Sequence, residues 1–154
     1  MKKQLKYCYN WPRPMVTVDA IVFNVSCPEK LLLIKRGKEP FKGMWALPGG
    51  FVEMNEELKD AAGRELKEET GLEKIMLEQM HTFGKCGRDP RGRNITVAFI
   101  GLTDDSNAKI RPGDDAACAK WFEITNLPDM AFDHNEVAEI AIEKFRSMHN
   151  PNSS

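Results

Sequence analysis

The chain has 154 residues, with 22 Lys and Arg against 23 Asp and Glu for a net charge of −1, and 42% of its residues are hydrophobic. This composition is typical of one globular domain with a real core, and it excludes intrinsic disorder for most of the chain. The near-neutral charge removes the usual electrostatic attraction to long nucleic acid, and no apolar run approaches the roughly 20 residues of a membrane helix.

We therefore expect neither long nucleic acid nor a membrane as partner. Met1-Lys2-Lys3 is not followed by an apolar signal core, so we expect a cytoplasmic protein. Its four scattered cysteines fit neither a disulfide framework nor a zinc site. Residues 1–150 are expected to form a single domain, and residues 151–154 a disordered tail.

Runs of β-branched and apolar residues predict the strands, and a short further segment is expected at 45–47 in a loop-rich region. The predicted strands are 16–22, 31–34, 75–83, 95–102 and 119–124, the first two joined by a turn at 27–30. Helical spacing predicts a first helix capped by Asn55 and ended by Gly71, and a second helix capped by Asp133. This order favours a mixed sheet with a helix on each face.

The first predicted helix carries acids on its apolar face. On a helical wheel Glu65 and Glu69 lie within about 20° of Leu58, and Glu68 lies at the edge of the same sector. Carboxylates this close repel one another unless a cation compensates them, and oxygen donors without His or Cys suit Mg²⁺ or Mn²⁺ rather than Zn²⁺. The alternative is a solvated acidic face paired with basic neighbours on the helix, Lys59, Arg64 and Lys67.

The spacing of these residues favours the metal site. From residue 50 the chain reads Gly-x5-Glu-x7-Arg-Glu-Leu-x-Glu-Glu-x-Gly-Leu, with the defined positions at Gly50, Glu56, Arg64, Glu65, Leu66, Glu68, Glu69, Gly71 and Leu72. This pattern resembles the Nudix box at every defined position, and the flanking segments resemble a Nudix domain over most of the chain. The resemblance implies an α/β/α sandwich with a mixed sheet between helices. It also implies a hydrolase that cleaves a nucleoside diphosphate linked to another group.

The resemblance also implies roles for individual residues. Three carboxylates match the metal-binding positions of the family, with the Gly49 carbonyl as a further ligand: Glu65, Glu68 and Glu69. Arg64 and Glu56 match the supporting pair, in which Arg64 holds a carboxylate in place; a simple surface ion pair is the alternative. The cation neutralises the phosphates and acidifies water, and Glu68 or Glu69 is the candidate base.

Three segments outside the box resemble the bacterial ADP-ribose pyrophosphatase branch of the family: residues 12–20, 88–93 and 132–135. Four arginines are candidates to bind the diphosphate and terminal ribose: Arg36, Arg88, Arg91 and Arg93. A solvated hairpin tip is the alternative explanation for residues 91–93. Tyr9, Trp11 and Phe41 are candidates to stack on adenine, or else packing or dimer contacts, and His81 and His134 are expected to be structural.

These segments predict Mg²⁺- or Mn²⁺-dependent hydrolysis of ADP-ribose to AMP and ribose 5-phosphate. We expect a stand-alone enzyme, and the resemblance implies a homodimer. Two alternatives stay open. One is a hydrolase that removes oxidised nucleoside triphosphates such as 8-oxo-dGTP. The other is a sensor that binds ADP-ribose without cleaving it. Hydrolysis of NADH is less favoured, because the chain lacks the Ser-Gln-Pro-Trp-Pro-Phe sequence of that subfamily.

Overall fold

The computed structural model describes residues 7–104, 110, 111, 113 and 116–149, so the predicted tail lies outside the described residues. Its elements are, in chain order, β1 (Met15–Asn24), β2 (Lys30–Arg36), β3 (Trp45–Ala46), β4 (Gly49–Phe51), α1 (Leu58–Thr70), β5 (Leu77–Phe83), β6 (Asn94–Thr103), β7 (Ala116–Glu123) and α2 (His134–His149). The predicted order of strands and helices is confirmed.

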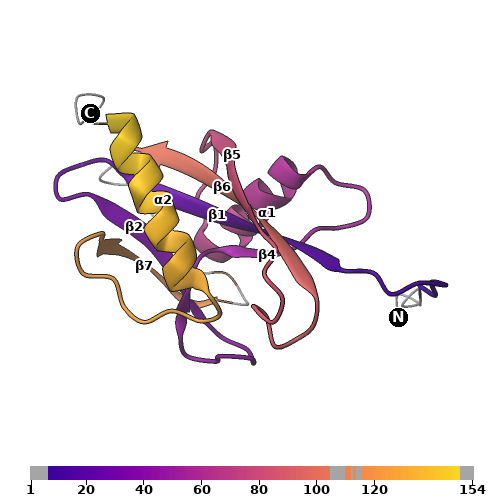
Figure 1. The fold of residues 1–154 in the computed structure, drawn as a ribbon. Coiled ribbons are helices and arrows are strands. Elements are labelled where there is room, and N and C mark those ends of the chain that lie inside the picture. Colours follow the sequence, from indigo (N-terminus) through magenta and orange to yellow (C-terminus); the bar gives the residue numbers. More distant parts are fainter. Residues whose placement is uncertain (1–6, 105–109, 112, 114–115, 150–154) are drawn as a thin grey trace.

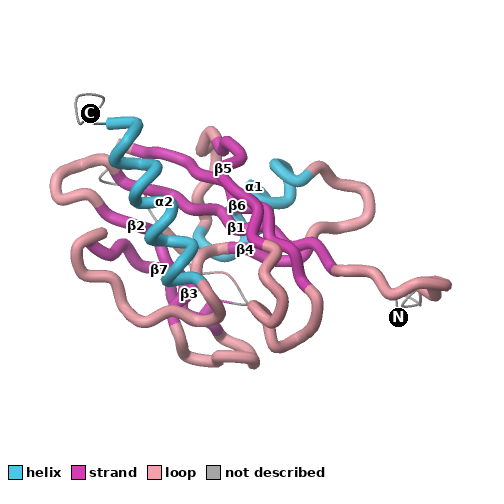
Figure 2. The backbone as a smooth tube through the Cα atoms, viewed as in Figure 1, coloured by secondary structure: helices cyan, strands magenta, loops and turns pink. Residues whose placement is uncertain are grey.

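One sheet contains all the strands, in the order β3-β2-β1-β6-β5, with β7 paired to β2 and β4 paired to β1. The long β1 and β6 run parallel from Met15 opposite Asn94 to Asn24 opposite Thr103. The other pairs are antiparallel, including the predicted hairpin of β1 and β2. The sheet is therefore mixed, as predicted, and β1 lies at its centre (Figures 1 and 2).

The two helices cover opposite faces of this sheet because the side chains of β1 alternate between them. Val18, Ala20 and Val22 pack with the apolar residues of α1. Ile21 and Phe23 pack with α2, where the Phe23 ring stacks on Phe145 at a centroid distance of 4.6 Å. The predicted α/β/α sandwich is thus confirmed, and α2 crosses the front of the sheet in Figure 1. No helix in the described ranges is long and apolar enough to cross a membrane.

The start of α1 corrects one prediction. The helix begins at Leu58 with Glu57 at its N-cap, not after Asn55. Glu56 is held outside the helix, since its carboxylate accepts hydrogen bonds from the Glu53 amide (2.8 Å) and from the Arg64 guanidinium. Gly71 ends the helix as predicted, at a φ of 75° that favours glycine.

A second difference concerns Gly49 and Gly50, which were expected in a loop but form β4 with Phe51. This short strand pairs with β1, with Gly49 opposite Asp19 and Gly50 opposite Val18. Glycine is poor in strands by propensity, and only the close packing around β4 explains it here. The pairing places the glycines beside the carboxylates of α1.

Candidate active site

The acidic residues of α1 lie as the helical wheel predicts. The side chain of Glu65 is 14% exposed and that of Glu68 is 58% exposed, and Glu69 is partly buried. Glu65 and Glu69 therefore point toward the sheet, among residues such as Leu66 that anchor the helix there. The fold keeps these acids on a face that an ordinary amphipathic helix would fill with Leu.

Arg64 connects the acids of the motif. Its guanidinium donates to both carboxylate oxygens of Glu56, at 2.7 and 2.9 Å, and to Glu65 at 2.7 Å and Glu68 at 3.3 Å. A fourth partner is the carbonyl of Phe51, at 3.1 Å. The hydrogen bonds from Arg64 lower the pKa of Glu56 to about 2. Arg64 therefore ties the helix to the turn before it and to β4, and is more than an isolated surface ion pair.

Glu69 lies deepest. Its Oε2 accepts a hydrogen bond from the Gly49 amide at 2.9 Å. Burial, helped by the neighbouring charges of Glu65 and Asp19, raises the pKa of this carboxyl from 4.5 to about 8, although the Gly49 hydrogen bond lowers it. Burial likewise raises the pKa of Glu65. Glu65 is paired with Arg64, whereas no described cation pairs directly with Glu69.

The paired glycines bring the backbone against these carboxylates. A Cβ added at Gly50 would lie 2.4 Å from a Glu65 oxygen, and one at Gly49 would lie 2.2 Å from the Val18 carbonyl oxygen. No side chain larger than hydrogen fits at either position without displacing its neighbour. This steric requirement explains why glycine occupies both positions.

The donors at this site fit a hard divalent cation. They are carboxylate oxygens and a peptide carbonyl, and the raised pKa values of Glu65 and Glu69 show that the site favours added positive charge or a proton. Within the described ranges no three acid, His or Cys side chains are already placed to hold one metal ion, and Glu65 and Glu68 are both hydrogen-bonded to Arg64. The residues that would hold Mg²⁺ or Mn²⁺ are Glu65, Glu68, Glu69 and Gly49 through its carbonyl.

Two adjoining hollows share this site. The carboxylate cleft, of about 360 Å³, is lined by Arg64, Glu65 and Glu69 among others. The inner pocket, of about 50 Å³, reaches from Glu69 to Asp19 and His134. Arg36, Gly49, Gly50 and Glu69 line both, so an anion held by Arg36 lies next to the carboxylates.

The four predicted arginines have different surroundings. Arg36 and Arg91 lie 4.9 and 5.0 Å from the centroid of the Phe132 ring, and both line the inner pocket. Burial and the nearby charge of Arg91 lower the pKa of Arg36. The two guanidinium groups thus converge on one wall, and that of Arg91 is also paired with Asp89 at 2.7 Å.

Arg88 also lines the inner pocket, but its guanidinium is largely occupied. It bonds both carboxylate oxygens of Asp133, at 2.7 and 2.8 Å, and also the hydroxyl of Thr96. The Arg88 side chain is only 4% exposed. Asp133 was predicted to cap the second helix, and α2 begins directly after it. Its carboxylate binds Arg88 and so connects α2 to the 84–93 loop. Arg93 is exposed and lines none of the three hollows described for this structure.

The sequence reasoning missed Asp19, and it expected His134 to be structural. Asp19 is 5% exposed in β1, and burial raises its pKa to about 7. His134 is 7% exposed, and burial lowers its pKa to about 4, so the ring is neutral at pH 7. An acid inside the apolar run Val18-Asp19-Ala20-Ile21-Val22 was the signal available in the sequence.

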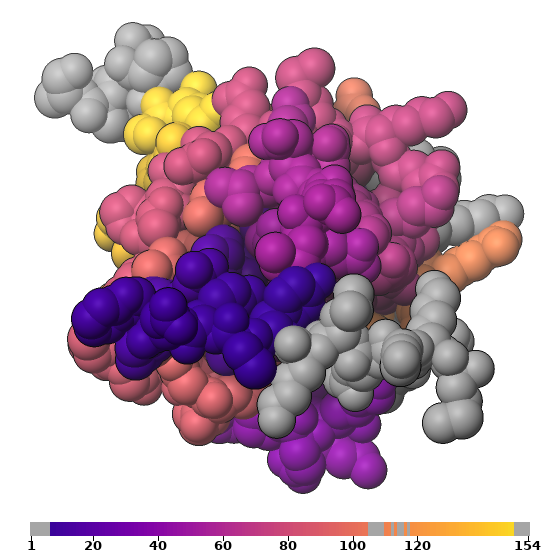
Figure 3. Space-filling model, turned by 90° about the vertical axis from the view of Figure 1, so that its right-hand side faces the viewer, coloured from indigo at the N-terminus to yellow at the C-terminus, as the bar shows by residue number. Residues whose placement is uncertain are grey.

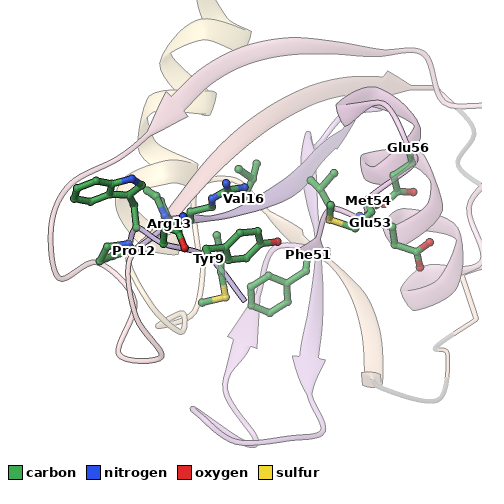
Figure 4. Close-up of a pocket in the computed structure, with 13 residues that line it drawn as sticks. Tyr9, Pro12, Arg13, Val16, Phe51, Glu53, Met54 and Glu56 are labelled. Carbon is green, nitrogen blue, oxygen red and sulfur yellow. Dashed lines mark hydrogen bonds between the residues drawn. The ribbon is translucent and has the colours of Figure 1, made fainter. Parts of the chain in front are cut away.

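A wider groove of about 820 Å³ lies between residues 9–16 and residues 51–56. Figure 3 shows the N-terminal segment, in indigo, lying against the magenta part of the surface. In Figure 4 Tyr9 and Arg13 lie on one side and Phe51 and Met54 on the other. Tyr9 and Trp11 line this groove, whereas Phe41 packs edge-to-face on Phe132.

Comparison with known proteins agrees with this geometry. The family model described as "NUDIX domain" matches residues 13–144. The ADP-ribose pyrophosphatase of Methanocaldococcus jannaschii is 43% identical over 136 residues, which are 88% of this chain and 78% of that protein. The ADPR responsive transcriptional repressor NtrR of Acinetobacter baylyi is 34% identical over 90% of this chain, which spans only 57% of the repressor.

Among solved structures, the NUDIX domain of Shewanella oneidensis NrtR complexed with ADP ribose superposes with a TM-score of 0.80. It is 32% identical, over 88% of this chain and 90% of that one. The chain belongs to the NUDIX domain family, and the resemblance inferred from the box is confirmed. The predicted class, a Nudix pyrophosphohydrolase, is supported by the family match and by the relative from Methanocaldococcus jannaschii.

Proposed function

We propose that the protein hydrolyses the pyrophosphate bond of ADP-ribose, with Mg²⁺ or Mn²⁺, to give AMP and ribose 5-phosphate. The observation that carries this proposal is the arrangement of opposite charges across one small site. The carboxylates of α1 lie on one side, and Arg36 and Arg91 lie over Phe132 on the other. Such a site suits a diphosphate that bridges protein cations and a metal. The ADP-ribose named for the relatives agrees with it.

The chain's own residues divide the work. Arg36 and Arg91 bind the diphosphate oxygens, and Arg88 holds the 84–93 loop against α2 through Asp133. Arg64 keeps Glu65 in place. A divalent cation held by these carboxylates would neutralise phosphate charge and acidify water. Glu68 or Glu69 is the candidate base for the attacking water.

The direct test is turnover of the purified protein in Mg²⁺ and, separately, in Mn²⁺. The substrates are ADP-ribose, NADH, diadenosine polyphosphates, nucleotide sugars and 8-oxo-dGTP. We expect kcat/KM for ADP-ribose to exceed the others tenfold or more, about 1.4 kcal/mol of transition-state discrimination. A preference for 8-oxo-dGTP would instead support the nucleoside triphosphate alternative.

Single arginine variants test the cationic wall. Arg36→Ala and Arg91→Ala are expected to raise KM for ADP-ribose about tenfold, because each removes a cation that binds the ground state and the transition state alike. Arg93→Ala tests the remaining predicted contact, and an unchanged KM would assign that residue to the solvated hairpin tip. Lys59→Ala, on the exposed side of α1, is the matched control.

A second function, sensing ADP-ribose without cleavage, is favoured by the likeness to the repressor NtrR. Thermal unfolding separates the two functions. If ADP-ribose raises Tm but no metal supports turnover, the sensing function replaces the enzymatic one. If the parent protein hydrolyses ADP-ribose and Glu69→Gln does not, a protein that only senses ADP-ribose is excluded.

We also propose that the protein is a homodimer. Exposed aromatic side chains on the N-terminal segment, with Trp11 79% exposed and Tyr9 46% exposed, provide apolar area for such a contact. Light scattering should give twice the 17.5 kDa mass of one chain. A measured mass of a single chain would refute this proposal.

A further inference from the structure

A buried carboxylate oxygen beside the candidate metal site has no hydrogen-bond partner among the described residues. It is Oδ2 of Asp19, on the central strand β1. Nε2 of His134 lies 3.6 Å from it, beyond hydrogen-bond distance, and both side chains are less than 10% exposed. Burying a carboxyl without a hydrogen-bond partner costs free energy unless a polar neighbour stabilises it. The pair therefore calls for an explanation beyond packing.

The hydrogen bond that the His134 ring accepts decides which ring nitrogen carries the proton. Nδ1 accepts a hydrogen bond from the Leu47 amide at 3.0 Å, so it cannot carry a proton itself. A neutral ring then bears its proton on Nε2, the nitrogen that faces Asp19. His134 thus connects the backbone between β3 and β4 to the carboxyl of β1.

The backbone that His134 contacts leads directly into the candidate ligand Gly49. Three consecutive residues are tied to three different elements: Leu47 to α2 through His134, Pro48 through its carbonyl to β1 at 2.8 Å, and Gly49 through its amide to Glu69 of α1. Asp19 is the strand partner of Gly49, and a Cβ at Gly49 would lie 2.5 Å from its Oδ1. The Leu47–Gly49 backbone, which includes the candidate ligand Gly49, is therefore held from all three layers of the fold.

We propose that His134 and Asp19 are positioning residues that hold the Leu47–Gly49 backbone in the orientation needed to bind the divalent cation. His134 holds the Leu47 amide, and Asp19 holds the imidazole in the tautomer that accepts from this amide. Neither residue touches the cation or the reacting phosphate. This inference rests on the proposed function, because it concerns the same metal site.

The first test is the affinity of the full chain for Mn²⁺ alone, measured by electron paramagnetic resonance without substrate. His134→Leu removes the hydrogen bond to the Leu47 amide and the contact with Asp19 at similar volume, and is expected to weaken Mn²⁺ binding about tenfold or more. His134→Asn keeps an acceptor near the Leu47 amide and should recover at least half of the loss on a logarithmic scale. His81→Leu, an exposed His on β5, is the matched control with unchanged affinity.

Asp19→Asn separates positioning from direct metal binding, because it removes the charge but keeps the shape and an acceptor for Nε2. Positioning predicts a smaller loss of Mn²⁺ affinity than in His134→Leu, with KM for ADP-ribose within about twofold of the parent. A larger loss in Asp19→Asn would make Asp19 a metal ligand and overturn the proposal.

The ring tautomer gives a readout that depends on neither metal nor activity. Nitrogen NMR of the imidazole at pH 7 should show a neutral His134 with its proton on Nε2, in the parent and in Asp19→Asn. A proton on Nδ1, or unchanged Mn²⁺ affinity in a folded His134→Leu, would refute the inference while leaving the proposed function intact. If the parent itself bound no Mn²⁺ and showed no turnover, the proposed function would fail, and the inference with it.

Discussion

Replacing Glu69 by Gln measures how much an ionisable carboxyl at the buried end of the site lowers the free energy of unfolding. The substitution preserves the shape of the side chain, and the amide oxygen of Gln can still accept the hydrogen bond of the Gly49 amide. Only the ability to ionise is lost. The effect on stability without metal therefore reports the penalty that a bound cation would offset.

The sign and size of this effect follow from the pKa of Glu69, which burial raises from 4.5 to about 8. The unfolded chain releases this proton above pH 4.5, whereas the folded protein retains it until pH 8. Stability therefore falls as pH rises through this range, by about 1.4 kcal/mol for each pH unit. At pH 7 the penalty amounts to at most about 3 kcal/mol, and Glu69→Gln removes it.

Urea unfolding with a metal chelator, followed by tryptophan fluorescence, checks this expectation. At pH 7 Glu69→Gln should be more stable than the parent by about 2 to 3 kcal/mol, and near pH 5 the two should agree within about 1 kcal/mol. With Mg²⁺ at 100 times its Kd, the parent should gain about 2.7 kcal/mol. The variant should gain little, and its turnover should fall about 100-fold or more.

Two results would refute this reasoning. A variant less stable than the parent at pH 7 would show that Glu69 is ionised and compensated within the protein alone. A variant that kept the Mg²⁺-dependent gain in stability would show that the cation binds elsewhere.

Other substitutions test the packing around the site. Gly50→Ala places a Cβ 2.4 Å from Glu65 and should lower Mn²⁺ affinity and turnover at least about tenfold. Gly63→Ala, in the interior of α1 and with open space around it, is the control and should raise the free energy of unfolding by about 0.5 to 1 kcal/mol. Arg88→Met should lower that free energy by about 3 kcal/mol, because it leaves Asp133 without its buried partner; a loss under 1 kcal/mol would contradict this.

Helical periodicity alone predicted much of the active-site helix. The inward placement of Glu65 and Glu69 depends only on a repeat of 3.6 residues and on the apolar neighbours along the same face. Gly71 could be recognised as the helix end for a similarly local reason, since its left-handed conformation belongs to a single residue. The helix start could not, because Glu56 is drawn out of the helix by a side chain eight residues later.

The contacts of the arginines, in contrast, could not be predicted from the sequence. Composition indicated cations for an anionic ligand, but it could not show that Arg36 and Arg91 meet over Phe132 while Arg88 is largely bound by Asp133. These pairings join loops that are up to 96 residues apart, taking the difference 132 − 36 in the printed numbering. Which loops meet depends on how the strands are ordered in the sheet.

The sequence by itself determined the sandwich of helices around a mixed sheet, the inward position of the carboxylates and the family of the chain. Each of these follows from a local period or from a fixed spacing of residues. Only the tertiary structure decided that Gly49 and Gly50 form a strand, and that Asp19 and His134 lie behind it. The physical reason is that strand register and buried polar pairs arise from contacts between distant segments. Such contacts leave no periodic pattern in the chain.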